Sequence, residues 1–462
     1  MTCWPNLRKK KKVNPKRFKE RTRNDGVSAP SGNVMNPKPP QNKVNFPLVK
    51  PLPHHSFDSD AMKVYERLSG LKYKTYFVGG CIRDLLLGMK PKDFDLVTSA
   101  LPRRIRKIFR NSRLIGKRFL LVNVFFGDKI VEVSTFRRTP WENGGPEKSN
   151  FSPISRDNSF GTDEEDALRR DFTINALFYD PSEREVIDYV NGINDLQMGK
   201  IRMIGDPEVR FCEDPVRIIR ALKLKARLKF EIVPETQRAL QKCVPKLAQN
   251  SSSRIFLELN KILRCGAAFP CFKHMAESSI FGIVAPGIQK IFDSEKHPGR
   301  QSMMEMLEYI DKAVPKSKGD FGDASLLAAL CLPVVSAQKR TGWDIPGELY
   351  CQQKVNVILS KLGVSKKLMN KIVQVLRIHF YLSNPQNQTP EKVKKITRSQ
   401  YLQDVTEFLS IYSLVDHSLE KVNALLQCQP VEEPSPKKHP GKERRRKDEI
   451  ETRKKSTDAR PS

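Results

Sequence analysis

Two aspartates two residues apart and a glutamate further along are the side chains of this 462-residue chain best suited to chemistry. Asp93 and Asp95 stand two residues apart in a segment, 93–98, that reads as a β-strand, so both side chains are expected on one face. Glu132 lies between two valines in a second predicted strand and offers a third carboxylate. Such hard oxygen ligands suit Mg²⁺. The pattern predicts a magnesium site on Asp93 and Asp95 with Glu132 beside it, although Glu132 alone would also fit ordinary surface alternation.

Gly79 and Gly80 stand a short distance before the two aspartates, between a predicted strand, TYFV, and a predicted helix that ends at Gly88. Backbone amides at a helix start can approach a triphosphate where no side chain intervenes, and the helix dipole favours its charge. An ordinary tight turn would use the same two glycines. Together with three acidic side chains, however, the turn provides for in-line attack of a hydroxyl on an α-phosphate, with two metal ions bridging the attacking and leaving oxygens.

A triplet of Arg169, Arg170 and Asp171 follows further along the chain. It falls in a segment, 166–177, whose apolar spacing predicts an amphipathic helix. Guanidinium groups on such a helix could grip phosphate and ribose. A solvated helix face is the alternative interpretation.

The segment FCEDPVRIIRAL predicts another helix, over 214–228. Pro215 suits its first turn and Asp214 suits its N-cap, which places Arg217 and Arg220 one or two turns inside. A capped helix with surface arginines would explain these residues without any ligand.

The elements that must position these groups form a small mixed sheet followed by helices. Strands are expected over 75–78, over 93–98 and in a hairpin that turns at Gly127 and Asp128. Helices are expected at 61–70, 81–88 and 102–110 beside the sheet, and at 166–177, 214–228, 235–247 and 255–264 after it, with a strand pair at 185–189 and 200–203. The predicted fold class is α+β, a small mixed β-sheet head followed by an all-α neck, body and tail.

The chain is strongly basic, with 82 Lys and Arg against 52 Asp and Glu and a formal net charge of +30. Only part of this charge lies near the two ends, so the middle of the chain is itself basic. Such a charge indicates a polyanionic partner such as nucleic acid. Nine cysteines without a CxxC pair and seven histidines without a ligand motif argue against a zinc site. No apolar run approaches the roughly 20 residues that span a bilayer, so no membrane partner is expected.

Composition divides the chain into five parts. Residues 1–57 are predicted to be a disordered basic arm, 58–180 the head, 181–265 a neck, 266–429 a helical body and tail, and 430–462 a disordered charged tail. The arm has no acidic residue among its first nineteen, which suits an organellar transit peptide for a chloroplast or mitochondrion, and its LRKKKK suits a nuclear signal equally well. A solvated basic arm is the third interpretation, and an intracellular rather than secreted protein is expected in each case.

FVGGCIRDLLLG followed by KDFDLVT and EVSTFR resembles the head of class II nucleotidyltransferases, the family of CCA-adding enzymes and bacterial-type poly(A) polymerases. The resemblance implies that Asp93 and Asp95 bind the metals and that Glu132 helps to organise the primer 3′-hydroxyl. It also implies that Gly79, Gly80 and Arg83 hold the triphosphate. EEDALRRDFTINALFYD is similar to the family motif whose RRD triplet, here Arg169, Arg170 and Asp171, contacts the nucleotide sugar.

The resemblance continues into the neck, where IDYVNGINDL is similar to a hinge-like family motif. In FCEDPVR, Glu213, Asp214 and Arg217 would read the pairing edge of the incoming base, and Arg220 is counted with these nucleotide-binding residues. Aspartate and arginine together offer acceptors and donors, so a protein surface can replace a template. Selectivity of this kind can be large because a wrong base leaves buried polar groups unpaired.

Two features bear on the branch of the family. LIGKRFLLVNVFFG, with Gly116, Lys117, Arg118 and Phe119, resembles the stretch by which poly(A) polymerases differ from CCA-adding enzymes, although the poly(A) form usually has His where this chain has Asn123. The segments DNSFGTDEEDALRRDFTINAL and IGDPEVRFCEDPVRIIRAL look more like the bacterial poly(A) enzymes.

The sequence therefore favours a template-independent adenylyltransferase that uses Mg²⁺ and ATP and extends an RNA 3′-end. A CCA-adding enzyme on the same fold and a non-catalytic RNA-binding protein remain as alternatives.

Overall fold

The computed structural model describes residues 44–45, 52–116, 120–138, 160–316, 321–337, 346–415 and 417–427. Every described residue belongs to one compact unit, Asn42–Ser462. Residues 1–43 and 46–51 of the predicted basic arm, the tail 430–462, and Lys117, Arg118 and Phe119 lie outside the described residues. Among the helices that are described, none is long and apolar enough to cross a membrane.

The head is built on an eight-stranded mixed sheet with the order β1-β8-β7-β2-β3-β6-β5-β4. Only the β3–β6 pair is parallel among these strands. The strands are β1 (Val44–Asn45), β2 (Thr75–Val78), β3 (Leu96–Thr98), β4 (Ser112–Ile115), β5 (Leu121–Phe126), β6 (Lys129–Thr135), β7 (Leu177–Asp180) and β8 (Glu185–Asp188). The β5–β6 hairpin turns at Gly127 and Asp128, as expected from the sequence.

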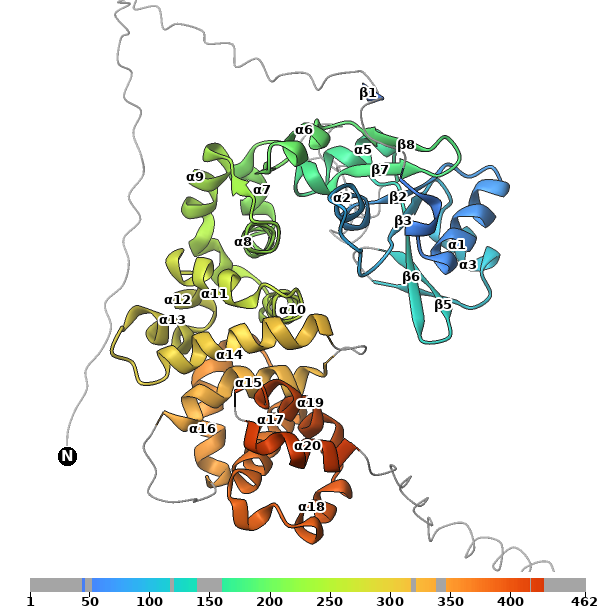
Figure 1. Ribbon diagram of the computed structural model, residues 1–462. Helices are drawn as coiled ribbons and strands as arrows, with labels where there is room; N and C mark the ends of the chain where they lie inside the picture. Colours follow the sequence, from blue (N-terminus) through green and yellow to red (C-terminus); the bar gives the residue numbers. More distant parts are fainter. Residues whose placement is uncertain are drawn as a thin grey trace, which may run out of the picture. The chain divides into compact units, whose positions relative to one another are not determined.

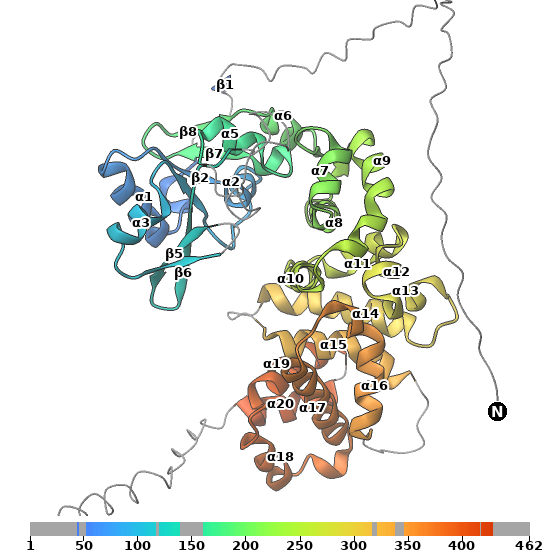
Figure 2. The same cartoon turned by 180° about the vertical axis from the view of Figure 1, so that it is seen from behind.

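Alternation along the strands gives the sheet two apolar faces. Phe77, Leu96 and Val133 belong to the large core that includes α1 (Ser59–Gly70) and α3 (Pro102–Ile108). Val97 belongs to a smaller cluster on the other face, together with Ala167 of α5 (Asp163–Leu168). The helices α1 and α3 lie together beside β5 and β6 in both views (Figure 1, Figure 2).

The head extends beyond the range 58–180 at both ends. The ring of Phe57, just before α1, stacks on Tyr179 with ring centroids 5.1 Å apart. Strand β8, which follows residue 180, pairs with β7 and also with β1. Because these pairings extend the sheet beyond β7, β8 and β1 belong to the head by packing.

The rest of the described chain is helical apart from a short parallel pair, β9 (Lys200–Ile201) and β10 (Glu231–Ile232). Helices α2 (Gly80–Leu86) and α6 (Gly192–Gln197) adjoin the head sheet and its hinge-like segment. The neck contains α7 (Pro207–Glu213), α8 (Val216–Leu228), α9 (Pro234–Cys243) and α10 (Ser252–Leu263). The body contains α11 (Ala268–Glu277), α12 (Ile280–Val284), α13 (Pro286–Asp293), α14 (Arg300–Ala313), α15 (Asp323–Ser336), α16 (Glu348–Leu359), α17 (Lys366–Ser383), α18 (Pro390–Thr397), α19 (Leu402–Tyr412) and α20 (Glu420–Gln427).

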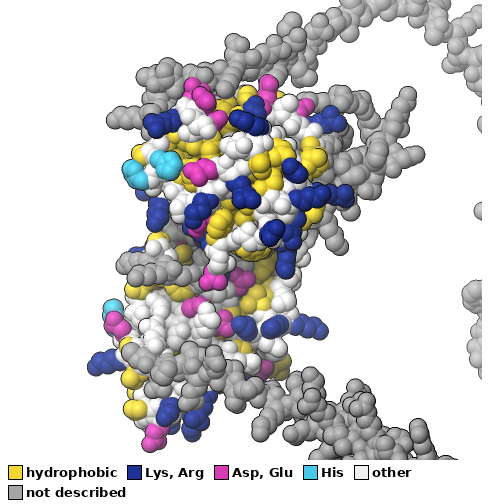
Figure 3. Space-filling model, turned by 90° about the vertical axis from the view of Figure 1, so that its right-hand side faces the viewer, with side chains coloured by type: hydrophobic (Ala, Val, Ile, Leu, Met, Phe, Trp, Pro, Cys, Tyr) yellow, Lys and Arg dark blue, Asp and Glu magenta, His cyan; other side chains and the backbone are white. Residues whose placement is uncertain are grey.

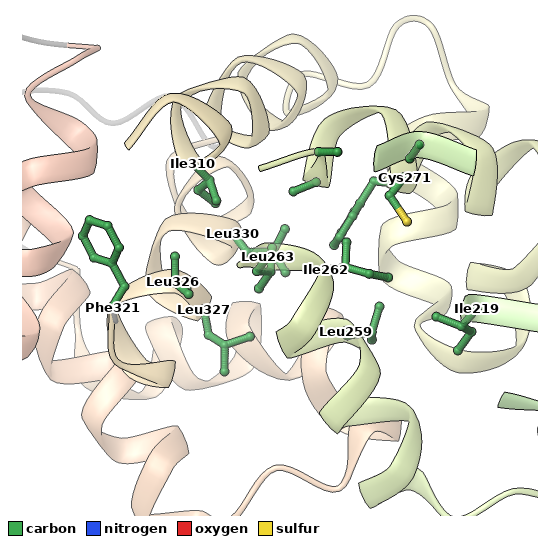
Figure 4. Close-up of a cluster of buried hydrophobic side chains, with 14 of the residues drawn as sticks. Ile219, Leu259, Ile262, Leu263, Cys271, Ile310, Phe321, Leu326, Leu327 and Leu330 are labelled. Atoms are coloured by element: carbon green, nitrogen blue, oxygen red, sulfur yellow. The ribbon is translucent and has the colours of Figure 1, made fainter. Parts of the chain in front are cut away.

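Neck and body share one hydrophobic core. Ile219 of α8 and Leu263 of α10 are in the same buried cluster as Leu327 and Leu330 of α15 (Figure 4). Helix α15 is buried along nearly its whole length, which matches its continuous apolar sequence, SLLAALCLPVV. The neck therefore has a packed support on its body side.

Several sequence-based element predictions were wrong in detail. Strand β3 begins at Leu96, so Asp93 and Asp95 precede it instead of lying in it. The helix expected over 166–177 ends at Leu168, and the chain continues through a 3₁₀ turn into β7. The strand pair expected between 185–189 and 200–203 does not form, because β8 joins the head sheet and β9 pairs with β10.

The start of α8 also differs from the prediction. Asp214 is the C-cap of α7 and Pro215 the N-cap of α8, and no side-chain hydrogen bond caps α8. The Asp214 carboxylate instead pairs with Arg254 of α10, so it does not cap α8 as the local sequence predicts.

Candidate active site

The sheet register brings Asp95 and Glu132 together. Leu96 of β3 is the partner of Val133 in the parallel β6, so Asp95 and Glu132, one residue earlier in each segment, are neighbours. Both point away from the face of Leu96 and Val133 because side chains alternate. The Asp95 carbonyl accepts a hydrogen bond from the amide of Val78 at 3.0 Å, which continues the β2–β3 ladder past the end of β3. The extended backbone at Asp95 therefore keeps this residue aligned with β2, as the longer predicted strand would.

The carboxylates of this group interact electrostatically. Loss of hydration among the surrounding protein groups raises the pKa of Asp95 to about 6, although its side chain stays partly exposed, and the charges of Glu132 and Asp93 add to this rise. Loss of hydration likewise raises the pKa of Glu132, which is also partly exposed, with a further contribution from Asp93. Lys261, on α10, opposes the rise at both Asp95 and Glu132. The site is a concentration of negative charge that nearby cations offset only in part.

The glycine turn lies at the same end of the sheet. The amide of Gly79 donates to the carbonyl of Leu177, at the start of β7, at 3.0 Å. Gly79 has φ +84°, which L side chains rarely adopt, and a Cβ there would lie 3.5 Å from Nη1 of Arg170. The positive φ lets α2 start at once after β2. Arg170 therefore stands directly beside the turn, and its charge also lowers the pKa of Asp95.

Asp166 holds both arginines of the RRD triplet. Its carboxylate is buried and accepts from Nε of Arg169 at 3.1 Å and from Nη2 of Arg170 at 2.9 Å. The guanidinium of Arg170 also lies 5.3 Å from the ring centroid of Phe178. From α7, Arg210 donates to the carbonyls of Arg169 and Arg170 at 2.5 and 2.8 Å. The triplet is thus fixed from the head and from the neck.

Arg83 lies under the glycine turn, where it is buried. Its Nη2 is 2.6 Å from Oδ1 of Asp84, and its Nη1 donates to Oδ1 of Asn175 at 2.5 Å. Asn175 in turn donates to Asp171 at 3.1 Å. Asp84, also buried, receives Nη2 of Arg227 from α8 at 2.7 Å. In this geometry Arg83 connects the turn to Asp171 by hydrogen bonds.

The predicted base-reading residues gather between α7, α8 and α10. Glu213 pairs with Arg210 at 2.8 Å and with Arg217 at 3.2 Å. Asp214 Oδ2 accepts from Arg254 of α10 at 2.8 Å, whereas its Oδ1 is buried without a hydrogen-bond partner. That buried oxygen is an acceptor that the described protein groups leave unsatisfied.

Arg220 faces two acidic groups. Its Nε donates to Glu258 of α10 at 3.0 Å, and its Nη1 lies 3.7 Å from Oδ2 of Asp171. Lys223 also pairs with Glu258, at 3.1 Å. Arg220 therefore links the RRD triplet to the core of the neck.

Among the residues that the structure describes, no three or more His, Cys, Asp or Glu side chains are grouped so that they could hold a metal ion by themselves. The donor set around Asp95 nevertheless fits Mg²⁺ in its chemistry, since it consists of carboxylate oxygens carrying excess negative charge. Mg²⁺ is often bound by one or two carboxylates together with substrate phosphates.

Five further residues were not identified from the sequence: Asp84, Asp166, Arg210, Arg227 and Glu258. For Asp166 a signal existed, because Arg169 and Arg170 follow it at three and four residues, the spacing of helical ion pairs. For the other four the decisive partners lie far away in the sequence. Asn123, in contrast, was singled out for its type, and it lies across the β5–β6 register from Glu132 with its Oδ1 buried and unpaired.

Two family models match the chain. Residues 75–202 match the Poly A polymerase head domain, and residues 229–292 match the model described as the probable RNA and SrmB-binding site of polymerase A. These two regions therefore match domains of the tRNA nucleotidyltransferase/poly(A) polymerase family, as the motifs predicted.

Curated relatives name two activities. The chain is 45% identical over 240 residues to poly(A) polymerase I of Salmonella typhi, which covers 50% of this chain and 51% of the relative. It is 39% identical over 252 residues to poly(A) polymerase I of Haemophilus influenzae, covering 54% and 56%. A CCA-adding enzyme of Streptococcus suis is 35% identical over 204 residues, covering 44% and 49%. The chain thus spans about half the length of the curated relatives it matches.

A solved structure supports the fold. The CCA-adding enzyme of Bacillus stearothermophilus, solved with CTP, aligns with a TM-score of 0.54 at 24% identity, covering 79% of this chain and 80% of that one. The predicted α+β class, a mixed-sheet head followed by helices, is confirmed.

Proposed function

We propose that this protein is a template-independent polynucleotide adenylyltransferase that adds AMP from ATP to RNA 3′-ends. The observation that carries the proposal is the register of β3 and β6, which sets Asp95 beside Glu132 next to the Gly79 turn and Arg170. Identities of 39 and 45% to two poly(A) polymerases I, against 35% to a CCA-adding enzyme, favour ATP as the only nucleotide.

Each group has a part in the proposed reaction. The 3′-oxygen of the primer forms a bond to the α-phosphorus, the bond from that phosphorus to the bridging oxygen breaks, and pyrophosphate leaves while the hydroxyl proton passes to solvent. Arg170 and the amides of the Gly79–Gly80 turn hold the triphosphate, and Glu132 orients the 3′-hydroxyl. Mg²⁺ held by Asp93 and Asp95 would neutralise charge on the attacking and leaving oxygens.

Base choice is assigned to the neck. Asp214 keeps one buried oxygen unpaired, and Arg217 lies within one turn of it on α8. A buried acceptor of this kind favours a base that donates to it, because any other base leaves it unsatisfied. The N6 amino group of adenine is such a donor, and so is the N4 amino group of cytosine, so the choice between ATP and CTP needs further contacts, which we assign to Arg217 and Glu213.

A matrix of nucleotides and primers tests the proposal. Purified protein is incubated with Mg²⁺, a labelled RNA and each nucleoside triphosphate in turn. We expect lengthening with ATP alone, and loss of lengthening in Asp95→Asn. Asp128→Asn is the matched control, because Asp128 is exposed in the β5–β6 turn of the same head.

Two outcomes would overturn the proposal. Addition of CTP and ATP that stops at a defined length on tRNA ends would identify a CCA-adding enzyme. RNA binding without transfer of any nucleotide would identify a non-catalytic RNA-binding protein. Normal lengthening by Asp95→Asn would refute the assignment of the metal ligand.

A further inference from the structure

The head carries a basic cavity that the proposed reaction does not use. It has a volume of about 890 Å³ and is lined by Lys63, Glu66 and Arg67 of α1, by Lys107, Ile108, Phe109, Arg110 and Asn111 at the end of α3, and by Phe126 at the end of β5. We call it the basic cavity. Four of its lining residues are cationic and one is acidic, and all five are exposed.

The cations of the basic cavity have few internal partners. Lys63 pairs with Asp60 at 2.8 Å, but within the described ranges no carboxylate pairs with Arg67, Lys107 or Arg110. Two cations lie against aromatic rings, Arg67 at 5.8 Å from the centroid of Phe109 and Lys63 at 5.9 Å from that of Phe126. Such contacts hold a charge in place and leave its hydrogen-bond donors available.

The backbone around the cavity is braced. Nη1 of Arg106 donates to the carbonyl of Arg110 at 3.0 Å, and Asn111 donates its side-chain amide to the carbonyl of Phe125. These bonds fix the turn between α3 and β4, which contributes Phe109, Arg110 and Asn111 to the lining of the cavity. Arg103, Arg106 and Lys107, all exposed, continue the positive charge along α3. Figure 3 views the molecule from its right-hand side in Figure 1 and shows Lys and Arg side chains over the upper part, which is the head.

The basic cavity is separate from the candidate active site. It is formed by α1 and α3, which pack on the face of the sheet that carries Phe77, Leu96 and Val133. Asp95 and Glu132 point to the opposite face because side chains alternate. A ligand in the cavity would therefore not be the reacting 3′-end or the reacting nucleotide.

We infer that the basic cavity binds the sugar-phosphate backbone of single-stranded RNA upstream of the 3′-end. Lysine and arginine donors suit phosphate oxygens, and the partly exposed ring of Phe126 beside Lys63 suits an unpaired strand more than a rigid duplex. The inference rests on the proposed function, which supplies a long RNA as substrate. A free nucleoside triphosphate shares the phosphate chemistry and is the other source that the test must separate.

The test compares two variants that lose the same charge. Arg67→Gln, Lys107→Gln and Arg110→Gln are combined in the cavity variant. Lys72→Gln, Arg184→Gln and Lys296→Gln, three exposed cations outside the cavity, form the control. Binding of a fluorescent single-stranded RNA and of fluorescent ATP is measured by anisotropy at several salt concentrations, without Mg²⁺, so that no extension is needed.

We expect the cavity variant to bind RNA about tenfold more weakly at low salt and its log–log salt slope to fall by about 2, because each lost phosphate contact contributes about 0.7. The control should keep the slope of the wild type. Equal RNA affinity and slope in the cavity variant and the wild type would overturn the inference. Weakened ATP binding with unchanged RNA binding would also overturn it and would identify a triphosphate site. Failure of nucleotide transfer, by contrast, would refute the proposed function and leave this binding result standing.

Discussion

Glu258 provides a quantitative test of how the neck holds the candidate site. Its carboxylate, 4% exposed, accepts from Arg220 at 3.0 Å and from Lys223 at 3.1 Å. Burial alone would raise its pKa, but the charges of Lys223, Arg220 and Lys261 lower it from 4.5 to about 2. A fall of this size corresponds to about 3 kcal/mol of stability.

The sign of the pH dependence follows from the lowered pKa. A carboxylate that is more acidic in the folded state stabilises the fold above its unfolded pKa of 4.5, and this stabilisation is lost as pH falls toward 2. Glu258→Gln should therefore cost about 3 kcal/mol at pH 7, because Arg220 and Lys223 keep their charges without the carboxylate. The difference between variant and wild type should shrink between pH 4.5 and pH 2.

Urea unfolding followed by circular dichroism measures this difference. Glu231→Gln is the matched control, since Glu231 pairs with Lys200 at 2.6 Å but is 78% exposed, and water screens such a pair. We expect a lower midpoint at pH 7 for Glu258→Gln and an unchanged midpoint for the control. Equal midpoints for the wild type and Glu258→Gln, or a difference that does not change with pH, would refute the reasoning.

Three further predictions concern other contacts of the site. Gly79→Ala should cost about 1–3 kcal/mol through its φ of +84° and should weaken ATP binding, whereas Gly70→Ala, with nothing near its Cβ, should do neither in melting and titration experiments. Arg227→Gln should cost about 1–3 kcal/mol of stability and lower the melting temperature, because buried Asp84 loses its partner from α8. Arg238→Gln, at an exposed site, should leave the melting temperature unchanged. Equal melting curves for the wild type and Arg227→Gln would contradict this prediction. Hydrogen peroxide should oxidise Cys212 and Cys243, whose sulfurs are 3.6 Å apart, to a disulfide, with release of two waters per peroxide. The intact mass of the wild type should therefore fall by two hydrogens. The same loss of mass in Cys212→Ser would exclude this pair of cysteines.

The sequence by itself determined the features that depend only on residues close together in the chain. The glycine turn after TYFV, the β5–β6 hairpin at Gly127 and Asp128, and the helix α1 all follow from turn chemistry and side-chain period. The motif residues Asp93, Asp95 and Glu132 were also found in this way, because their types and spacing can be seen without knowing where the strands lie.

Tertiary structure alone decided which of these groups meet. The parallel pairing of β3 and β6 sets Asp95 beside Glu132, and a contact across 143 residues joins Arg227 to Asp84. Asp214 would be a helix cap by local sequence, but Arg254 of α10 takes its carboxylate instead. The segment at Arg169–Asp171 likewise leaves the helix that its period predicts, because β7 pairs with β2 and draws the chain into the sheet. Local periodicity carries no information on such partners, because the free energy of these contacts is gained only when distant segments pack together and exclude water.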